Sequence, residues 1–257
     1  MNIFKRAWIR YILHRHVIAH NLWLDNTDNL PVLKGLIAVE KAHLRELTTL
    51  FLHEKNFIGT HGLQITNAMA ISIAVQACLP VLNLGIGCLN GWKDIVVYPA
   101  AFHISRDNMD ALGIVHHEEK LLAGESWSRG PVILSWEEVE RDAQGLQVGC
   151  NVVIHEIAHK LDMLNGSANG FPPLHYSMDI REWTHVMSSA YRELVERLEH
   201  QHRVSINPYA ATSPGEFFAV CTEYFFCAPE ILHTHFPEVH LQLQHYYRQD
   251  PLGRNAD

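Results

Sequence analysis

Two histidines four residues apart, with a glutamate directly after the first, form the segment His155-Glu156-Ile157-Ala158-His159. On an α-helix, residues four apart project side by side from one face, so both imidazoles can reach one ion. Neutral imidazole nitrogens suit Zn²⁺. Glu156 is offset around the helix, where it can take a proton from a zinc-bound water without binding the metal. The pattern therefore predicts one zinc ion per chain and metal-assisted hydrolysis.

The residues around this segment indicate that it is more than an accident of composition. The chain holds 19 His in 257 residues, and roughly 0.1 accidental matches per chain are expected for so short a motif. Its flanks, however, are apolar at residues 152–154, 157–158, 161 and 164, which is typical of a helix buried under an active site. Asn165-Gly166 marks the end of that helix, so the motif lies inside a helix of about four turns.

A catalytic zinc usually has three protein ligands, so a third must come from elsewhere. Asp162 lies on the same helical face, but its short side chain is better suited to accept a hydrogen bond from a ligand imidazole and fix its tautomer. Glu216 and Glu223 stand on the apolar segment 216–226, where buried carboxylates are costly unless they are paired or metal-bound. Ser213-Pro214-Gly215-Glu216 matches a capping box, which would make Glu216 structural and Glu223 the ligand. The pattern alone leaves this choice open.

The composition narrows the class of protein. With 257 residues and 47% hydrophobic content, the chain can bury a sizeable core as one large domain. Its formal net charge of −8 argues against nucleic acid as a partner, since neutralising phosphates needs a dense basic face. The 5 Cys include no C-x-x-C pair, which indicates buried thiols in a reducing, cytoplasmic compartment.

The first twenty residues differ in charge from the rest of the chain. They carry Lys5, Arg6, Arg10 and Arg15 and no acid, a local charge of +4 in a chain whose net charge is −8, so the remainder carries −12. Apolar residues recur at helical spacing between residues 3 and 12, which predicts a short basic amphipathic helix rather than a secretory signal. We expect residues 1–30 to be a flexible segment or a frayed helix docked on the domain, with contact to a membrane or an acidic partner as the alternative.

Helical periodicity dominates both ends of the chain, and short strands lie between. We predict a helical portion at 31–57 and a buried core helix at 67–82, whose apolar run is too short to span a bilayer. Short strands are predicted at 95–98, 113–116 and 131–136. These elements predict an α+β fold with a single domain over residues 31–257. In it the active-site helix packs on a small mixed sheet between helical N- and C-terminal portions.

The strand that precedes the active-site helix is a candidate for substrate binding. In zinc peptidases, an edge strand beside the metal helix pairs with the peptide by β-augmentation. Gly130–Trp136 is our candidate for that edge, with an interior strand that does not contact substrate as the alternative. His116 and His117 are adjacent on a predicted strand and point to opposite faces, so the pair cannot close on one ion.

Longer stretches of the chain carry a resemblance to a known family. They are residues 153–162, around the histidine pair, and residues 206–220 with 223–226. These stretches resemble the Mlc titration factor A family of bacterial zinc peptidases. The resemblance covers roughly residues 30–252, and the basic N-terminus departs from it. That family in turn resembles the catalytic domain of anthrax lethal factor, in which a tyrosine stands seven residues before the ligand glutamate, the spacing of Tyr209 and Glu216.

The resemblance implies roles that the pattern alone leaves open. It implies a zincin-like fold of the gluzincin type, with Glu216 as the third zinc ligand, Tyr209 as a donor to the transition state and Glu223 as an acid that supports a ligand. It also implies aminopeptidase-like cleavage of a peptide substrate, and binding of a Mlc-like repressor that controls sugar uptake. A mainly non-catalytic protein that sequesters such a repressor is the alternative.

Overall fold

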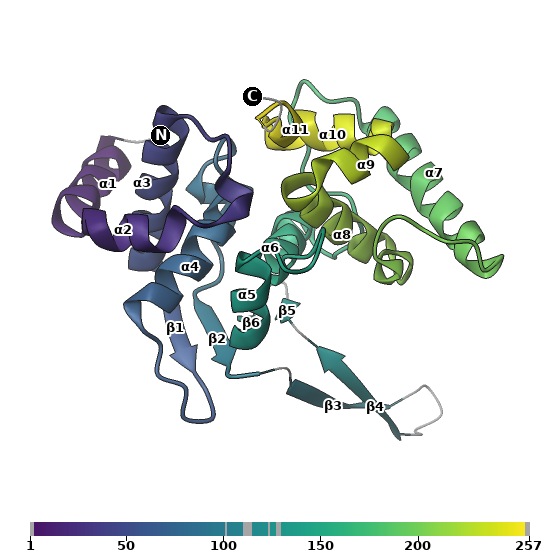
Figure 1. The fold of residues 1–257 in the computed structure, drawn as a ribbon, viewed down its shortest axis with the longest axis horizontal. Helices are drawn as coiled ribbons and strands as arrows, with labels where there is room; N and C mark the ends of the chain where they lie inside the picture. The colour runs from purple at the N-terminus through teal and green to yellow at the C-terminus, as the bar shows by residue number, and fades with distance from the viewer. Residues whose placement is uncertain (1–2, 101, 110–114, 123, 127–129, 255–257) are drawn as a thin grey trace.

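The computed structural model describes residues 3–100, 102–109, 115–122, 124–126 and 130–254. Figure 1 shows helices at both ends of the chain, with a small sheet and a protruding hairpin between them. The α+β class that the sequence predicts is therefore confirmed.

The N-terminal portion is helical. Its helices are α1 (Ile3–Arg15), α2 (His20–Thr27), α3 (Ala38–Glu54) and α4 (Asn67–Cys78). The helix predicted at 31–57 is shorter in the structure, because Pro31–Leu33 form a separate 3-10 turn and Gly35 takes a φ of +76° before α3 begins. α4 is the predicted core helix, and the hydroxyl of Thr66 caps its first turn.

A mixed sheet lies beside these helices. In the described chain it has four strands in the order β1 (Asn56–Gly59), β2 (Asp94–Tyr98), β6 (Val132–Ser135) and β5 (Gly124–Ser126). β1, β2 and β6 run parallel, and β5 pairs antiparallel with β6. The prediction that residues 130–136 form the free edge is wrong, because β6 lies inside the sheet with all of its residues buried. The edge beside β6 belongs to β5.

A long hairpin is inserted in the chain between β2 and β5. Its strands, β3 (Phe102–Met109) and β4 (Val115–Leu122), are antiparallel and extend away from the body of the molecule (Figure 1). β4 takes the place of the strand predicted at 113–116, of which residues 113 and 114 lie outside the described residues. His116 and His117 lie in β4, as predicted.

The C-terminal portion is built around two central helices. α6 (Val152–Asp162) and α8 (Pro214–Cys227) pack side by side, and α4 packs on another side of α6. Other helices of this portion are α5 (Trp136–Ala143), α7 (Ile180–Glu199), α9 (Pro229–His235), α10 (Pro237–Tyr247) and α11 (Pro251–Arg254). Buried residues of α4, α6 and α8 join one hydrophobic core, so the helix with the histidine pair is supported from two directions.

Residues 248–254 fasten the C-terminal helices to the N-terminal portion. Arg254 forms an ion pair of 2.7 Å with Glu40, which also caps the first turn of α3. Gln249 Nε2 donates to the carbonyl of Leu79, just beyond α4, at 2.9 Å. Contacts made by the side chains of Arg254 and Gln249 thus join the two helical portions in addition to the sheet.

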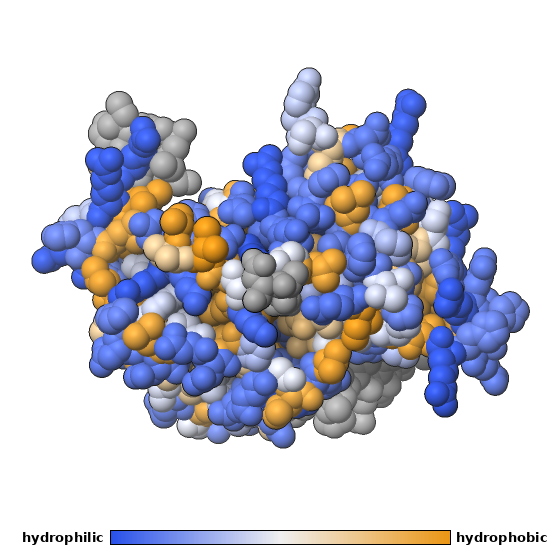
Figure 2. Space-filling model, turned by 45° about the horizontal axis from the view of Figure 1, so that its top comes forward, coloured by the Kyte–Doolittle hydropathy of each residue, from blue (hydrophilic) through white to orange (hydrophobic). Residues whose placement is uncertain are grey.

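The face seen in Figure 2 is mostly hydrophilic, with apolar side chains in separate groups. Scattered apolar atoms of this kind are usual on folded domains. No helix in the described ranges is both long enough and apolar enough to cross a membrane.

Candidate metal centre

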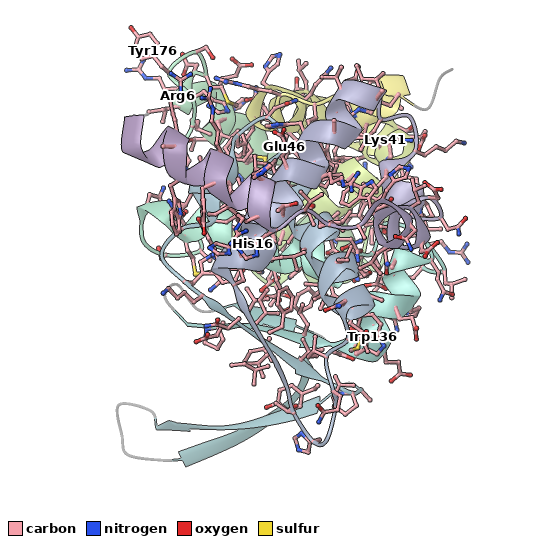
Figure 3. The ribbon with its side chains drawn as sticks, turned by 90° about the vertical axis from the view of Figure 1, so that its left-hand side faces the viewer. Arg6, His16, Lys41, Glu46, Trp136 and Tyr176 are labelled. Carbon is pink, nitrogen blue, oxygen red and sulfur yellow. The ribbon has the colours of Figure 1, made fainter. Side chains whose placement is uncertain are left out.

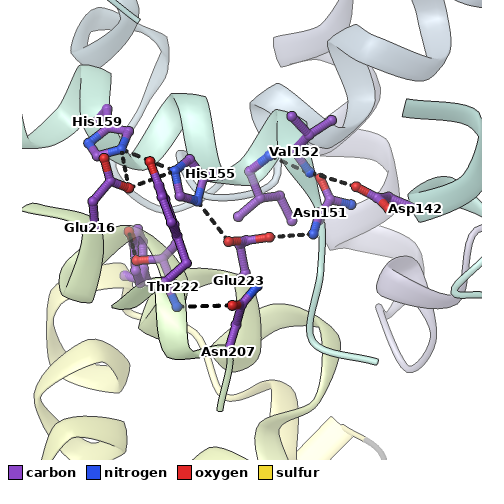
Figure 4. A network of polar contacts seen from close by, with 12 residues as sticks. Asp142, Asn151, Val152, His155, His159, Asn207, Glu216, Thr222 and Glu223 are labelled. Atoms are coloured by element: carbon purple, nitrogen blue, oxygen red, sulfur yellow. Dashed lines mark hydrogen bonds and ion pairs between the residues drawn. The ribbon is translucent and has the colours of Figure 1, made fainter. Parts of the chain in front are cut away.

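α6 starts at a polar junction that fixes its position (Figure 4). Asn151 caps the helix by accepting the amide of Ile154 at 2.9 Å, and its Nδ2 donates to Gln76 Oε1 of α4 at 2.7 Å. The carboxylate of Asp142 accepts the amide of Val152 at 2.9 Å. Because these contacts satisfy amides that a helix start leaves free, the first turn of α6 is held firmly.

Two histidines of α6 and a glutamate of α8 meet at one point (Figure 4). His155 Nε2 lies 3.1 Å from His159 Nε2, and Glu216 Oε2 lies 3.1 Å from the first nitrogen and 3.2 Å from the second. Among the described residues, these three form the group whose potential ligand atoms all lie within 4.8 Å of one another. Two imidazoles and a carboxylate are donors that zinc prefers, and they leave a fourth position open.

Only the Ser213 half of the predicted capping box is present among the described contacts, because the Glu216 carboxylate lies elsewhere. The backbone amide of Glu216 donates to the hydroxyl of Ser213 at 3.2 Å, so that Ser213 caps α8, while the Glu216 carboxylate lies against the histidines. Burial alone would raise the pKa of Glu216, but hydrogen bonding to the two imidazoles holds this pKa well below its usual range. The carboxylate is therefore ionised, as an anionic ligand must be.

Glu223 lies two turns further along α8 and contacts the opposite side of the His155 ring. Its Oε1 is 2.7 Å from His155 Nδ1, and its Oε2 accepts the amide of Asn151 at 2.6 Å. Burial would lower the pKa of His155, but Glu223 and Glu216 together raise it well above its ordinary value. An acid in this position fixes the tautomer and the direction of a ligating imidazole.

Glu156 is enclosed by the protein. Only 2% of its surface is exposed, and its Oε2 has no hydrogen-bond partner in the described part of the chain. Burial raises the pKa of this carboxyl to about 8. A buried carboxyl oxygen without a partner is costly, and such groups are typical of sites that bind or move a proton.

Tyr209 stands in a 3-10 turn, Pro208–Ala211, that packs against α8. Its ring centre lies 6.2 Å from that of His155, and 44% of the residue is exposed. Partial burial and the neighbouring Glu216 carboxylate raise the pKa of Tyr209, so the phenol keeps its proton at neutral pH. It is therefore available as a hydrogen-bond donor beside the convergent ligand atoms.

Asp162 contacts other groups than those predicted. Its carboxylate accepts the amides of Gly170 at 2.7 Å and Phe171 at 2.8 Å instead of a hydrogen bond from a ligand imidazole. His159 Nδ1 has no hydrogen-bond partner among the residues described. Gly170 has a φ of +77°, and a Cβ on it would lie 2.6 Å from the carbonyl oxygen of Pro214. Asp162 thus fixes a loop against the start of α8.

The sequence pattern did not identify three residues that fix the start of α6, which are Gln76, Asp142 and Asn151. A signal for Asn151 was present, because an asparagine directly before an apolar helical run is a typical N-cap. Gln76 lies 75 residues from Asn151, its partner, and belongs to another helix. No local pattern could have pointed to it.

Comparison with known proteins adds independent findings. Residues 4–248 match the family described as glucose-regulated metallo-peptidase M90. The chain is similar to Mlc titration factor A of Klebsiella pneumoniae, with 38% identity over 89% of this chain and 86% of that protein. The proteins of the same name from Salmonella choleraesuis and Yersinia pestis are 38% and 39% identical, over 90% and 88% of this chain and 87% and 84% of theirs. The family match includes most of the basic N-terminal segment, which the resemblance seen in the sequence did not cover.

Proposed function

The chain belongs to the glucose-regulated metallopeptidase family M90, and from this premise we propose that it is a zinc-dependent peptidase with a zincin-like site of the gluzincin type. The observation that supports the proposal most directly is the convergence of His155, His159 and Glu216 within 4.8 Å. Family membership implies a metal. The donor set favours zinc over magnesium or calcium, which prefer oxygen ligands.

The proposed ligands are His155, His159 and Glu216, with one zinc ion per chain. Their three nearest donor atoms lie 3.1–3.2 Å apart and belong to side chains from two helices that pack side by side. When bound, zinc would supply a water of lowered pKa and would polarise the peptide carbonyl. Glu223 would hold the His155 ring in the tautomer that ligates through Nε2.

We assign the proton transfers to Glu156, which stands beside a proposed ligand in the chain. Its carboxylate would take a proton from the attacking water as the water oxygen bonds to the peptide carbon. The same proton would pass to the departing nitrogen as the carbon–nitrogen bond breaks. Water and peptide thus give a carboxylic acid and an amine, without any further reagent.

Two other parts of the site would bind the substrate. Tyr209 would donate a hydrogen bond to the oxyanion that develops on the peptide carbonyl. An extended peptide would pair with the free edge of β5, because β5 ends the sheet and packs against α6. This proposal replaces residues 130–136, which the strand order excludes as an edge.

We also propose a regulatory role, in which the chain binds a Mlc-like repressor of sugar uptake in the cytoplasm. The name of its relatives, Mlc titration factor A, supports this proposal at 38–39% identity. Peptide cleavage is proposed to be aminopeptidase-like. The alternative function is sequestration of the repressor without catalysis. The relatives' name favours this alternative too, because titration of a protein describes binding and not cleavage.

Glu156→Gln distinguishes these functions. Glutamine keeps the shape of the side chain but cannot take a proton, so hydrolysis of amino-acid and peptide chromogens should fall to background while zinc content and fold are retained. Pull-down of purified Mlc repressor should be unaffected. Glu196→Gln, the same substitution at an exposed position of α7, is the matched control and should leave every readout unchanged.

Two outcomes would count against the proposal. Hydrolysis that survives in zinc-loaded Glu156→Gln would exclude Glu156 as the base. A wild-type chain that captures the repressor but hydrolyses no chromogen, with zinc bound, would favour the non-catalytic alternative.

A further inference from the structure

The N-terminal helix α1 presents aromatic and basic side chains to solvent. Ile12 is fully buried where α1 packs against α3, so the inner side of the helix is used by the fold. On the outer side, Trp8 and Tyr11 are each 53% exposed. Figure 3 faces this side of the molecule and shows α1 lying across it between Arg6 and His16.

The exposed rings are held in fixed positions. Trp8 and Tyr11 stack with their centres 5.9 Å apart and their planes 22° apart, and Trp8 also meets His53 of α3 edge-on at 5.9 Å. Val17, shortly after α1, is exposed as well. Neighbouring exposed apolar side chains mark interaction sites, and rings that are already ordered lose little conformational entropy on binding.

Three arginines accompany these rings without a counter-charge. Arg6, Arg10 and Arg15 are exposed, and no described residue forms an ion pair with any of them. The sequence contains no acid before Asp25. Glu46, an exposed acid of the neighbouring helix α3, lies 3.7 Å from His43 of its own helix. The exposed part of α1 therefore carries both basic and aromatic side chains on a chain whose net charge is −8, with Trp8 on the flank that meets His53 of α3 and Arg6 and Arg10 further around the helix.

We propose that α1 binds the surface of membranes that contain anionic lipid, with its arginines on the lipid phosphates and its aromatic rings among the headgroups. Tryptophan and tyrosine are enriched at this level of a membrane, and basic residues are attracted by anionic lipid. A single helix on the outside of the molecule suits a lipid surface, which needs no matching pocket. Because the rest of the chain is acidic, the same field orients the protein with α1 toward the membrane.

Co-sedimentation with lipid vesicles tests the proposal. The full chain is mixed with vesicles of phosphatidylcholine alone or of phosphatidylcholine with phosphatidylglycerol, at low and at high salt. We expect sedimentation with the mixed vesicles only, and release as salt screens the charges. Arg6→Gln and Arg10→Gln should each weaken partitioning roughly fivefold. Trp8→Ala and Tyr11→Ala should weaken it too, with circular dichroism as the check on folding.

Arg203→Gln is the matched control, because Arg203 is an exposed arginine shortly after α7, a helix that lies on the far side of the molecule from α1 (Figure 1). It should sediment like the wild type. Equal sedimentation with both vesicle types, or of wild type and the double variant Arg6→Gln/Arg10→Gln, would overturn the proposal. If the chain binds neither vesicle type but binds poly-glutamate in a salt-sensitive manner, the partner of α1 is instead an acidic protein. None of these readouts depends on the peptidase site.

Discussion

Oε1 of Glu223 lies 2.7 Å from Nδ1 of His155, so an acid of α8 orients a ring that projects from α6. The other oxygen of Glu223 accepts the amide of Asn151, and glutamine can accept with one oxygen only. We therefore predict that Glu223→Gln weakens zinc binding about 10–100-fold, measured by competition with a chelator. Glu196→Gln is the control, and an unchanged affinity in Glu223→Gln would show that other contacts orient His155.

Substitutions at Ser213 and Glu216, in the same helical turn, test helix capping and zinc ligation separately. Glu216→Gln keeps the amide that Ser213 caps but loses the anionic oxygen, so the protein should lose zinc with little change in its free energy of unfolding. Ser213→Ala removes the hydroxyl that accepts the Glu216 amide. It should lower stability by about 1 kcal/mol and keep its zinc. Metal analysis and urea denaturation of both variants measure zinc content and stability. Zinc retained by Glu216→Gln together with a loss of stability would identify Glu216 as a cap alone.

Tyr209→Phe tests the proposed oxyanion donor. Removing one such donor typically lowers kcat by about 10²–10³, and phenylalanine keeps the ring that lies beside His155. We expect this loss in kcat with KM, zinc content and melting temperature near wild-type values. If Tyr209→Phe changes KM and leaves kcat unchanged, the Tyr209 hydroxyl binds the substrate equally in the ground state and the transition state and does not stabilise the oxyanion.

Lys55 provides a pH test of the fold away from the metal centre. Its Nζ lies 3.8 Å from the centre of the Trp92 ring and donates to the carbonyls of Leu89 and Trp92. Burial lowers the pKa of Lys55 from 10.5 to about 8. Between these values the unfolded chain binds more protons than the folded chain, so the contribution of Lys55 to stability rises with pH.

We therefore expect the stability of the wild type relative to Lys55→Met to increase as the pH rises from about 8 towards 10.5. Urea denaturation of both proteins at each pH gives this difference and cancels the opposite effect of buried thiols such as Cys78, whose pKa burial raises. Lys34→Met, at an exposed position, should show no such trend. A difference that does not vary with pH would mean that the pKa of Lys55 is ordinary.

The part of the centre that one helix supplies could be predicted from spacing alone. His155, Glu156 and His159 stand in an apolar helical run, and neighbours four residues apart on a helix meet by local geometry. The role of Glu216 could not be predicted in this way, because its carboxylate reaches the histidines only through the packing of α8 on α6. The sequence pattern fitted both a capping box and a ligand, and in the structure the carboxylate lies against the histidines while only the Glu216 amide meets Ser213.

The order of the strands also lay beyond the sequence pattern. β5 has three residues, too few to show the alternation of a strand, so the sequence pattern does not predict it. The run Val132–Ser135 is apolar almost throughout, which is typical of an interior strand, and this signal favoured the alternative that the structure shows. The predicted hydrogen bond from a ligand imidazole to Asp162 is absent for a related reason. The partners of Asp162 in the structure, Gly170 and Phe171, lie in a loop outside the helical period.

The contacts made by residues 248–254 constrain the order in which native contacts can form while the chain is being synthesised. Arg254 meets Glu40 across 214 residues, and Gln249 meets Leu79 across 170. The entropy of closing such loops grows only slowly with length, but neither contact can form before Gln249 and Arg254 have been synthesised. During synthesis Glu40 and the carbonyl of Leu79 therefore lack these two partners and have only their local hydrogen bonds, from the amides of Ile37 and Leu82. The N-terminal portion acquires its full set of contacts only in a late step, together with the C-terminal helices.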